Sequence, residues 1–293
     1  EGGTVPAPID QSVTSVRDLA VYTGAVEDRL FFRGEGITTN AGPELWRYTA
    51  STATATEYDL VAGVSGSYPI GVTQVGSRLF VNAGQTLRRI DNPEGGPAWA
   101  TLATVKGPSG MVASGTTLWL RATSLADPQQ STLWRVIGAG APIEFVTVVN
   151  PAGIAMYQST PLYSAVNANG REFWAQTSLY TDIVPGPDSS DPTSITPIPS
   201  GDRVVMWTNL NGLTELGWIA ASGGVYPFHP YPGLDPLPID QPALPLEPDP
   251  GSGGWWHVGN DRAHGVSVWH LSSDGATTTR VPTTDLLPGT AAK

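Results

Sequence analysis

The sequence contains no cysteine among its 293 residues. This absence excludes a disulfide framework, a thiolate metal site and a cysteine nucleophile. Basic residues are also few, since Lys and Arg together number 15 against 26 Asp and Glu, and the net charge is −11. Nucleic acids and anionic membrane surfaces attract basic protein surfaces, so we expect neither as a partner.

Long apolar stretches are missing as well. No run approaches the roughly 20 residues that a membrane-spanning helix requires, so we expect no membrane span. The chain begins at Glu1 without Met, which we interpret as the mature form of an exported protein after removal of a signal peptide. Only 14% of residues are charged, and weakly charged, polar surfaces are common on exported proteins. The expected location is secreted, periplasmic or at the cell surface.

Turn-forming residues are abundant. The 34 Gly and 27 Pro disfavour long helices and suit many short strands. Between the turns, pairs of apolar and aromatic strands recur every 40–50 residues or so, which is the size of a propeller blade. The second strand of a pair usually carries Trp. The six pairs are 29–32 with 44–48, 78–81 with 86–90, 117–120 with 132–136, 161–164 with 172–175, 204–207 with 215–219, and 255–258 with 266–270.

A third, outer strand follows each pair, and a short strand rich in small residues precedes it. Small residues suit an innermost strand, where blades converge and space is least. The sequence therefore predicts an all-β fold, a single β-propeller domain over residues 1–293 with about six four-stranded blades. Five or seven blades fit if one unit is misread. The segment Gln11–Val16 either adds a strand to the last blade or simply leads in.

One segment breaks the repeat. Residues 227–254 contain nine prolines, and proline removes a backbone donor from a strand ladder. We expect an irregular loop insertion outside the ladders. It either forms a lip over the ligand-binding face or packs as a rigid excursion against one blade.

A family resemblance emerges near the start of the chain. Glu44-Leu45-Trp46, a small-residue turn, Leu60 and Gly66-Ser67-Tyr68-Pro69 resemble the bacterial repeats named for Glu-Leu-Trp-x-x-Asp-Gly-Thr. The match covers mainly Leu30 to Ala83, and Thr49-Ala50-Ser51 stands where those repeats have Asp-Gly-Thr. The resemblance implies propeller-like repeats in an exported or surface protein of bacterial type. It implies no particular activity, because those repeats are scaffolds.

The four histidines all lie in the last quarter of the chain. We pair Trp256 with Trp269 across the sixth hairpin, which places His257 and His270 on one sheet face; His229 and His264 lie nearby. Imidazoles so placed could bind a metal or act as a general base. No metal-binding spacing supports this, so we interpret them as structural and predict no metal and no cofactor.

Acidic side chains near turns are the candidates for catalysis. A hydrolase or lyase would use two carboxylates from different blades around the central channel, and spacing in the sequence selects no pair. A G-x-S-x-G nucleophile motif is also missing. Catalytic residues are therefore left unassigned. The acids in question are Glu35, Glu44, Asp127, Asp202 and Asp261.

Tryptophan is frequent, with 10 residues. Trp46, Trp134, Trp174, Trp218 and Trp269 occupy matching repeat positions, which predicts core packing between blades. Other Trp residues fall outside this pattern and are available to stack on a ligand. The predicted ligand-binding residues are Trp255, Trp256, His257, Trp207, Asp202, Asp127 and Glu35.

Three functions are open at this point. The first is an exported, non-catalytic binding module whose ligand is a glycan or a cell-surface protein. The second is a secreted hydrolase or lyase, and the third is a structural surface protein. We expect a monomer in each case.

Overall fold

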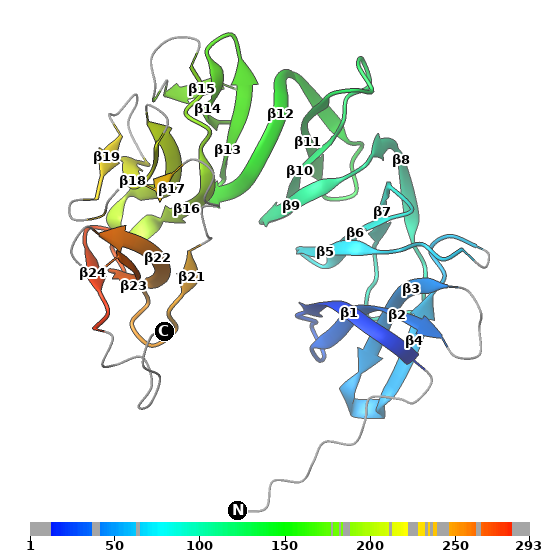
Figure 1. Cartoon of the computed structure of the whole chain (residues 1–293). Helices are drawn as coiled ribbons and strands as arrows, with labels where there is room; N and C mark the ends of the chain where they lie inside the picture. Colours follow the sequence, from blue (N-terminus) through cyan, green and yellow to red (C-terminus); the bar gives the residue numbers. More distant parts are fainter. Residues whose placement is uncertain are drawn as a thin grey trace, which may run out of the picture. The chain divides into compact units, whose positions relative to one another are not determined.

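The computed structural model describes residues 13–36, 42–62, 65–176, 178–181, 183, 188–210, 213–221, 228–231, 234, 237–238, 246–261 and 265–282 (Figure 1). These residues form β-strands and two short 3-10 turns, Ala50–Thr52 and Pro199–Gly201. Among them, no helix is long or apolar enough to cross a membrane. The chain divides into two compact units, Glu1–Val146 and Thr147–Lys293.

The first unit contains two complete four-stranded antiparallel sheets, each in chain order. Strands β9, β10 and β11 and the start of β12 follow them. The strands are β1 (Val13–Tyr22), β2 (Arg29–Gly36), β3 (Pro43–Thr49), β4 (Thr54–Tyr58), β5 (Ile70–Val75), β6 (Arg78–Ala83), β7 (Thr86–Ile90), β8 (Ala100–Lys106), β9 (Ser109–Ser114), β10 (Thr117–Thr123), β11 (Ser131–Ile137) and β12 (Ile143–Tyr157).

The second unit repeats the pattern. The end of β12 pairs with β13, and two further antiparallel sheets follow. The strands are β13 (Thr160–Asn167), β14 (Gly170–Ala175), β15 (Ser178–Thr181), β16 (Thr193–Ile198), β17 (Arg203–Leu210), β18 (Leu213–Ala220), β19 (His229–Pro230), β20 (Leu237–Pro238), β21 (Glu247–Pro248), β22 (Trp255–Asp261), β23 (Gly265–Leu271) and β24 (Thr278–Arg280).

The predicted fold class, an all-β propeller built of four-stranded blades, is confirmed. About six blades were expected, with five or seven possible, and the described strands form five separate sheets. The difference lies in β12, which is 15 residues long. Its first part is the outer strand after β11 and its second part is the inner strand before β13, so two successive blades share one seven-stranded sheet.

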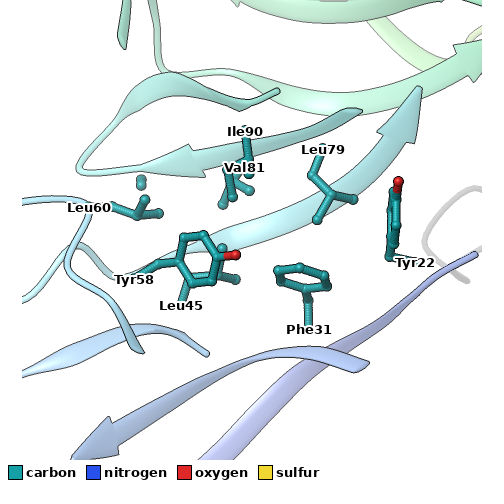
Figure 2. Close-up of a cluster of buried hydrophobic side chains, with 9 residues drawn as sticks. Tyr22, Phe31, Leu45, Tyr58, Leu60, Leu79, Val81 and Ile90 are labelled. Carbon is teal, nitrogen blue, oxygen red and sulfur yellow. The ribbon is translucent and has the colours of Figure 1, made fainter. Parts of the chain in front are cut away.

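The core lies between the faces of successive blades. In the first unit, Phe31, Leu45 and Tyr58 of the first blade pack against Leu79 and Val81 of the second, and all five are at most 1% exposed (Figure 2). A similar cluster joins the second blade to the third, where Trp134 packs with Phe80 and Leu118. Successive side chains of a strand point to opposite faces, so Leu79 and Val81 enter the first cluster while Phe80, between them, enters the second.

Four of the five tryptophans that were predicted to fill the core are buried. Trp46, Trp134, Trp174 and Trp269 are exposed by 5, 1, 7 and 7% respectively. Trp218 is half-buried beside the core cluster of the second unit. Each blade must fill a similar wedge, and a large flat ring at one strand position does so.

Both alternatives for the segment Gln11–Val16 were wrong. Its described part belongs to β1, which pairs antiparallel with β2 as the inner strand of the first blade. Residues 11 and 12 lie outside the described residues.

The expected irregular loop over the proline-rich stretch is interrupted by short ladders in its described part. Two-residue strands β19 and β20 pair with β18, and β21 pairs with β22. Tyr231 and Leu246 from this stretch are 3 and 8% exposed and belong to a core cluster. Proline is tolerated here because short edge ladders need few N–H donors. The outer strand expected at 224–228 lies almost wholly outside the described residues.

Candidate functional site

The described residues of the first unit form a groove. It lies where the first two blades meet, at the end where β2 finishes, β3 starts and the β4-to-β5 link passes. Two adjoining depressions of about 250 and 460 Å³ share Arg33 and Tyr68. We call them together the Tyr68 groove. Its lining residues are Ser15, Arg17, Arg33, Glu35, Pro43, Gly66, Ser67, Tyr68, Ile70, Asn82, Gly84 and Gln85.

Tyr68 has an unusual conformation. Its φ is +45°, in the left-handed region, and its side chain is 59% exposed. A bulky residue there is strained, and the following Pro69 further favours an extended backbone. Strain of this kind costs about 1–3 kcal/mol and concentrates at ligand-binding sites. Tyr68 therefore presents an aromatic ring to solvent at an energetic cost that packing does not explain.

A buried carboxylate fixes this conformation from below. Glu44 is fully buried and accepts hydrogen bonds from Leu60 N–H at 3.0 Å and from Ser67 N–H at 2.6 Å. The Ser67 hydroxyl also donates to it, at 2.5 Å. Burial raises the pKa of the Glu44 carboxyl, and these donors act against that rise. Glu44 was one of the candidate acids, and its oxygens are occupied by structural hydrogen bonds.

The second unit contains the same arrangement of hydrogen bonds around a buried carboxylate. Glu172, also fully buried, accepts from Ile183 N–H at 3.1 Å and from Ser190 N–H and hydroxyl at 3.0 and 2.6 Å. The residue after Ser190 is Asp191, whose φ of +42° matches that of Tyr68. Asp tolerates the left-handed region far better than Tyr does. Of the two residues at this repeat position, Tyr68 is therefore the one that does not suit its backbone conformation.

Charged side chains line the same depression as Tyr68. The Arg33 guanidinium lies 3.2 Å from the Asp18 carboxylate. Arg17 and Glu35 are exposed and line the smaller depression. Of the seven predicted ligand-binding residues, Glu35 is the only one that lines this groove.

Asp127 and Asp202 serve local structure. The Asp127 carboxylate accepts a hydrogen bond from Gln129 N–H at 2.9 Å within the turn between β10 and β11. Asp202, with a φ of +49°, accepts from the Tyr157 hydroxyl at 2.6 Å. Both carboxylates thus hold turns in place.

Trp207 and His257 lie in the core of the second unit, with exposures of 2 and 3%. The His257 ring lies between Trp207 and Trp269, at centroid distances of 6.4 and 6.5 Å. Burial lowers the pKa of His257 to about 4, so the imidazole is neutral at neutral pH. Neither residue is accessible to a ligand in this arrangement.

The expected pairing of Trp256 with Trp269 was wrong by one residue. Trp256 pairs with His270, and His257 pairs with Trp269. Since a shift of one residue moves every side chain to the other face, His257 and His270 lie on opposite faces. Trp256 is 36% exposed and packs on His270, with ring centroids 4.6 Å apart, while Trp255 packs beside a core cluster.

A surface cluster that the sequence did not suggest surrounds His270. The Ser252 hydroxyl lies 2.8 Å from His270 Nε2, and Asp249 Oδ2 lies 3.2 Å from the same nitrogen. A serine nucleophile requires the acid on Nδ1, so that Nε2 is free to accept the hydroxyl proton. Here both partners meet at Nε2, and Ser252 also donates to Asp249 at 2.6 Å. The cluster closes a turn and lacks the geometry of a triad.

Metal ligands do not converge anywhere in the described part of the chain, where no three His, Asp or Glu side chains could share an ion. His229 stacks on Trp218, with centroids 4.4 Å apart. His264 and the side chain of Asp261 lie outside the description.

The sequence matches no protein-family model and no curated protein. Solved structures are similar in fold. A prolyl endopeptidase is 10% identical with a TM-score of 0.54, over 93% of this chain and 42% of that one. A puromycin hydrolase is 12% identical with a TM-score of 0.54, over 96 and 49%. A puromycin-hydrolyzing peptidase of Mycobacterium tuberculosis is 11% identical with a TM-score of 0.52, over 95 and 46%. This chain therefore spans less than half the length of these enzymes, and the likeness concerns the fold.

Proposed function

We propose that this chain is a non-catalytic binding module that holds its ligand in the Tyr68 groove, on an exported protein. The observation that carries the proposal is the strained, exposed Tyr68, held from below by the Glu44–Ser67 hydrogen bonds. A rigid scaffold that presents one aromatic ring beside polar groups is typical of binding sites. The family resemblance agrees with a scaffold role.

Catalysis is disfavoured by the lining of the groove. Hydrolysis or elimination at a sugar requires two suitably separated acid or base groups. Among the described lining residues, Glu35 is the sole carboxylate, since Glu44 is buried beneath. The groove therefore offers contacts for binding and lacks a second catalytic acid.

The test combines binding and turnover on one set of probes. Immobilised glycans and peptides are exposed to the wild-type protein and to Tyr68→Asn, and the soluble products are then analysed by mass spectrometry. We expect retention of the wild type on at least one probe, loss of retention in Tyr68→Asn, and no shortened product. Product formation by the wild type would contradict the proposal, as would retention that is unchanged in the variant.

A further inference from the structure

The charges at the Tyr68 groove balance. Arg17 and Arg33 provide two positive charges. Glu35 in the lining, and Asp18 at 3.2 Å from Arg33, provide two negative ones. A ligand selected by charge needs a surface of opposite sign. This groove has no net charge to attract a carboxylate, sulfate or phosphate, although basic side chains line it.

The polar groups of the groove include both donors and acceptors. Guanidinium groups only donate, carboxylates only accept, and the amides of Asn82 and Gln85 do both. Asn82 is 7% exposed, and its amide N–H donates to Pro108 O at 2.8 Å. Its carbonyl oxygen is buried and has no partner among the described residues, so Gln85 is the amide that a ligand reaches. Such a mixed lining matches hydroxyl groups, since each hydroxyl both donates and accepts.

The Tyr68 ring supplies an apolar surface in the middle of these polar groups. It is shared by both depressions, and Ile70, 46% exposed, lies on the larger one. A pyranose ring has an apolar C–H face and a rim of hydroxyls. Tyrosine suits a ligand with one apolar side and one wet side. Both depressions border Tyr68, and together they provide room for neighbouring sugar units.

We infer that the ligand of the Tyr68 groove is an uncharged oligosaccharide. One sugar unit packs its C–H face on Tyr68, and its hydroxyls bond to Arg33 and to the amide of Gln85. Arg33 retains its ion pair with Asp18, which orients the guanidinium toward the groove without leaving a free charge. This inference rests on the proposed binding function and adds the class of ligand.

Calorimetric titration distinguishes the classes. The probes are neutral gluco-, xylo-, manno- and chito-oligosaccharides, uronate and sulfated oligosaccharides, and a mixed peptide pool, each at low and high salt. We expect a neutral oligosaccharide to bind with the same Kd at both salt concentrations. Salt screens attraction between charges, and an uncharged ligand has no such attraction to lose. Tyr68→Asn and Arg33→Ala should each weaken binding about tenfold or more, which corresponds to the loss of a well-formed contact.

The matched control is Asp191→Asn, at the equivalent repeat position of the second unit, and its affinity should equal that of the wild type. Preference for uronate or sulfated probes, with a Kd that rises with salt, would overturn this inference while leaving the binding function intact. Binding of peptides alone would do the same. Failure of every probe class to bind would overturn both proposals. Cleavage of a bound neutral oligosaccharide would overturn the non-catalytic part of the proposed function and would leave the class of ligand unchanged.

Discussion

Ser67 donates two hydrogen bonds to the carboxylate of Glu44, one from its backbone N–H at 2.6 Å and one from its hydroxyl at 2.5 Å. Ser190 donates the same pair to Glu172 in the second unit. The flanking sequences also agree, since Ser67-Tyr68-Pro69 corresponds to Ser190-Asp191-Pro192. In each case the residue after the serine, Tyr68 or Asp191, has a left-handed backbone conformation, and only Tyr68 is aromatic.

Glu44→Gln should destabilise the fold by about 1–3 kcal/mol, because an amide cannot accept all the hydrogen bonds that the carboxylate accepts, and a buried donor is left unpaired. Urea unfolding followed by Trp fluorescence measures the change. Glu172→Gln is the matched variant and should lose a similar amount. Ordinary surface substitutions change the free energy of unfolding by less than about 0.5 kcal/mol. A loss that small in both variants would contradict a structural role for the hydrogen bonds to Glu44 and Glu172.

Tyr68→Asn should leave the free energy of unfolding unchanged or raise it by up to about 1 kcal/mol, because Asn adopts the left-handed region more readily. The exposed ring loses little packing on substitution. Asp191→Asn should be close to neutral in the same unfolding experiment, since its backbone already suits Asp. A clear loss of stability in Tyr68→Asn would show that the ring is part of the packing, and would remove the argument for a binding role.

His257 makes stability depend on pH. Burial lowers its pKa to about 4 in the folded protein, against about 6.5 when unfolded. Between these values the unfolded chain binds more protons, so stability is full above pH 6.5 and falls as the pH decreases toward 4. The loss should be about 3 kcal/mol over this window. His257→Leu should flatten the profile over that range, and parallel profiles for the two proteins would contradict the assignment.

Tyr231 connects the proline-rich stretch to the core of the second unit. It is 3% exposed, and its hydroxyl donates to Gly275 O at 2.7 Å. Tyr231→Ala should cost about 3–5 kcal/mol, as for other buried aromatic residues. Tyr231→Phe removes only the hydrogen bond and should cost about 1 kcal/mol. If both variants melted at the same temperature as the wild type, Tyr231 would not attach this stretch to the core.

Replacement of residues 230–251 by a short Gly-Ser linker should therefore weaken the fold, since β19, β20, β21, Tyr231 and Leu246 would be removed. The expected result is a lower midpoint in urea, with the first unit less affected than the second. Residue-level hydrogen exchange measures the two units separately. Equal protection in the altered and the wild-type protein would contradict a structural role.

The repeat of strand pairs was predictable from the sequence because alternating apolar residues and intervening Gly and Pro reflect the same periodicity in each blade. The two-residue strands β19, β20 and β21 were not, since two residues carry no period. The pairing of Trp256 with His270 also could not be predicted. With adjacent Trp255 and Trp256 on one strand, hydrophobic pattern alone does not choose which of them faces the core.

The groove itself was only partly predictable. Glu35 was among the candidates, but Tyr68 entered only through the family resemblance, because backbone strain has no compositional signature. A signal was present in the recurrence of Ser-x-Pro after Glu-Leu-Trp and Glu-Phe-Trp, with Tyr where the other copy has Asp. Burial of Trp207 and His257 depends on contacts between strands far apart in the sequence, which composition does not reveal.

Hydrogen–deuterium exchange with and without a saturating mixture of neutral oligosaccharides tests the central claim most directly, since it reports where the ligand binds. The account predicts slower exchange in residues 66–70 and 82–85, which line the Tyr68 groove, and unchanged exchange in Trp255–Asp261 and around His270. The same protection should be absent in Tyr68→Asn. Protection that appears around Trp256 and His270 while the groove exchanges as before would contradict the assignment of the binding site.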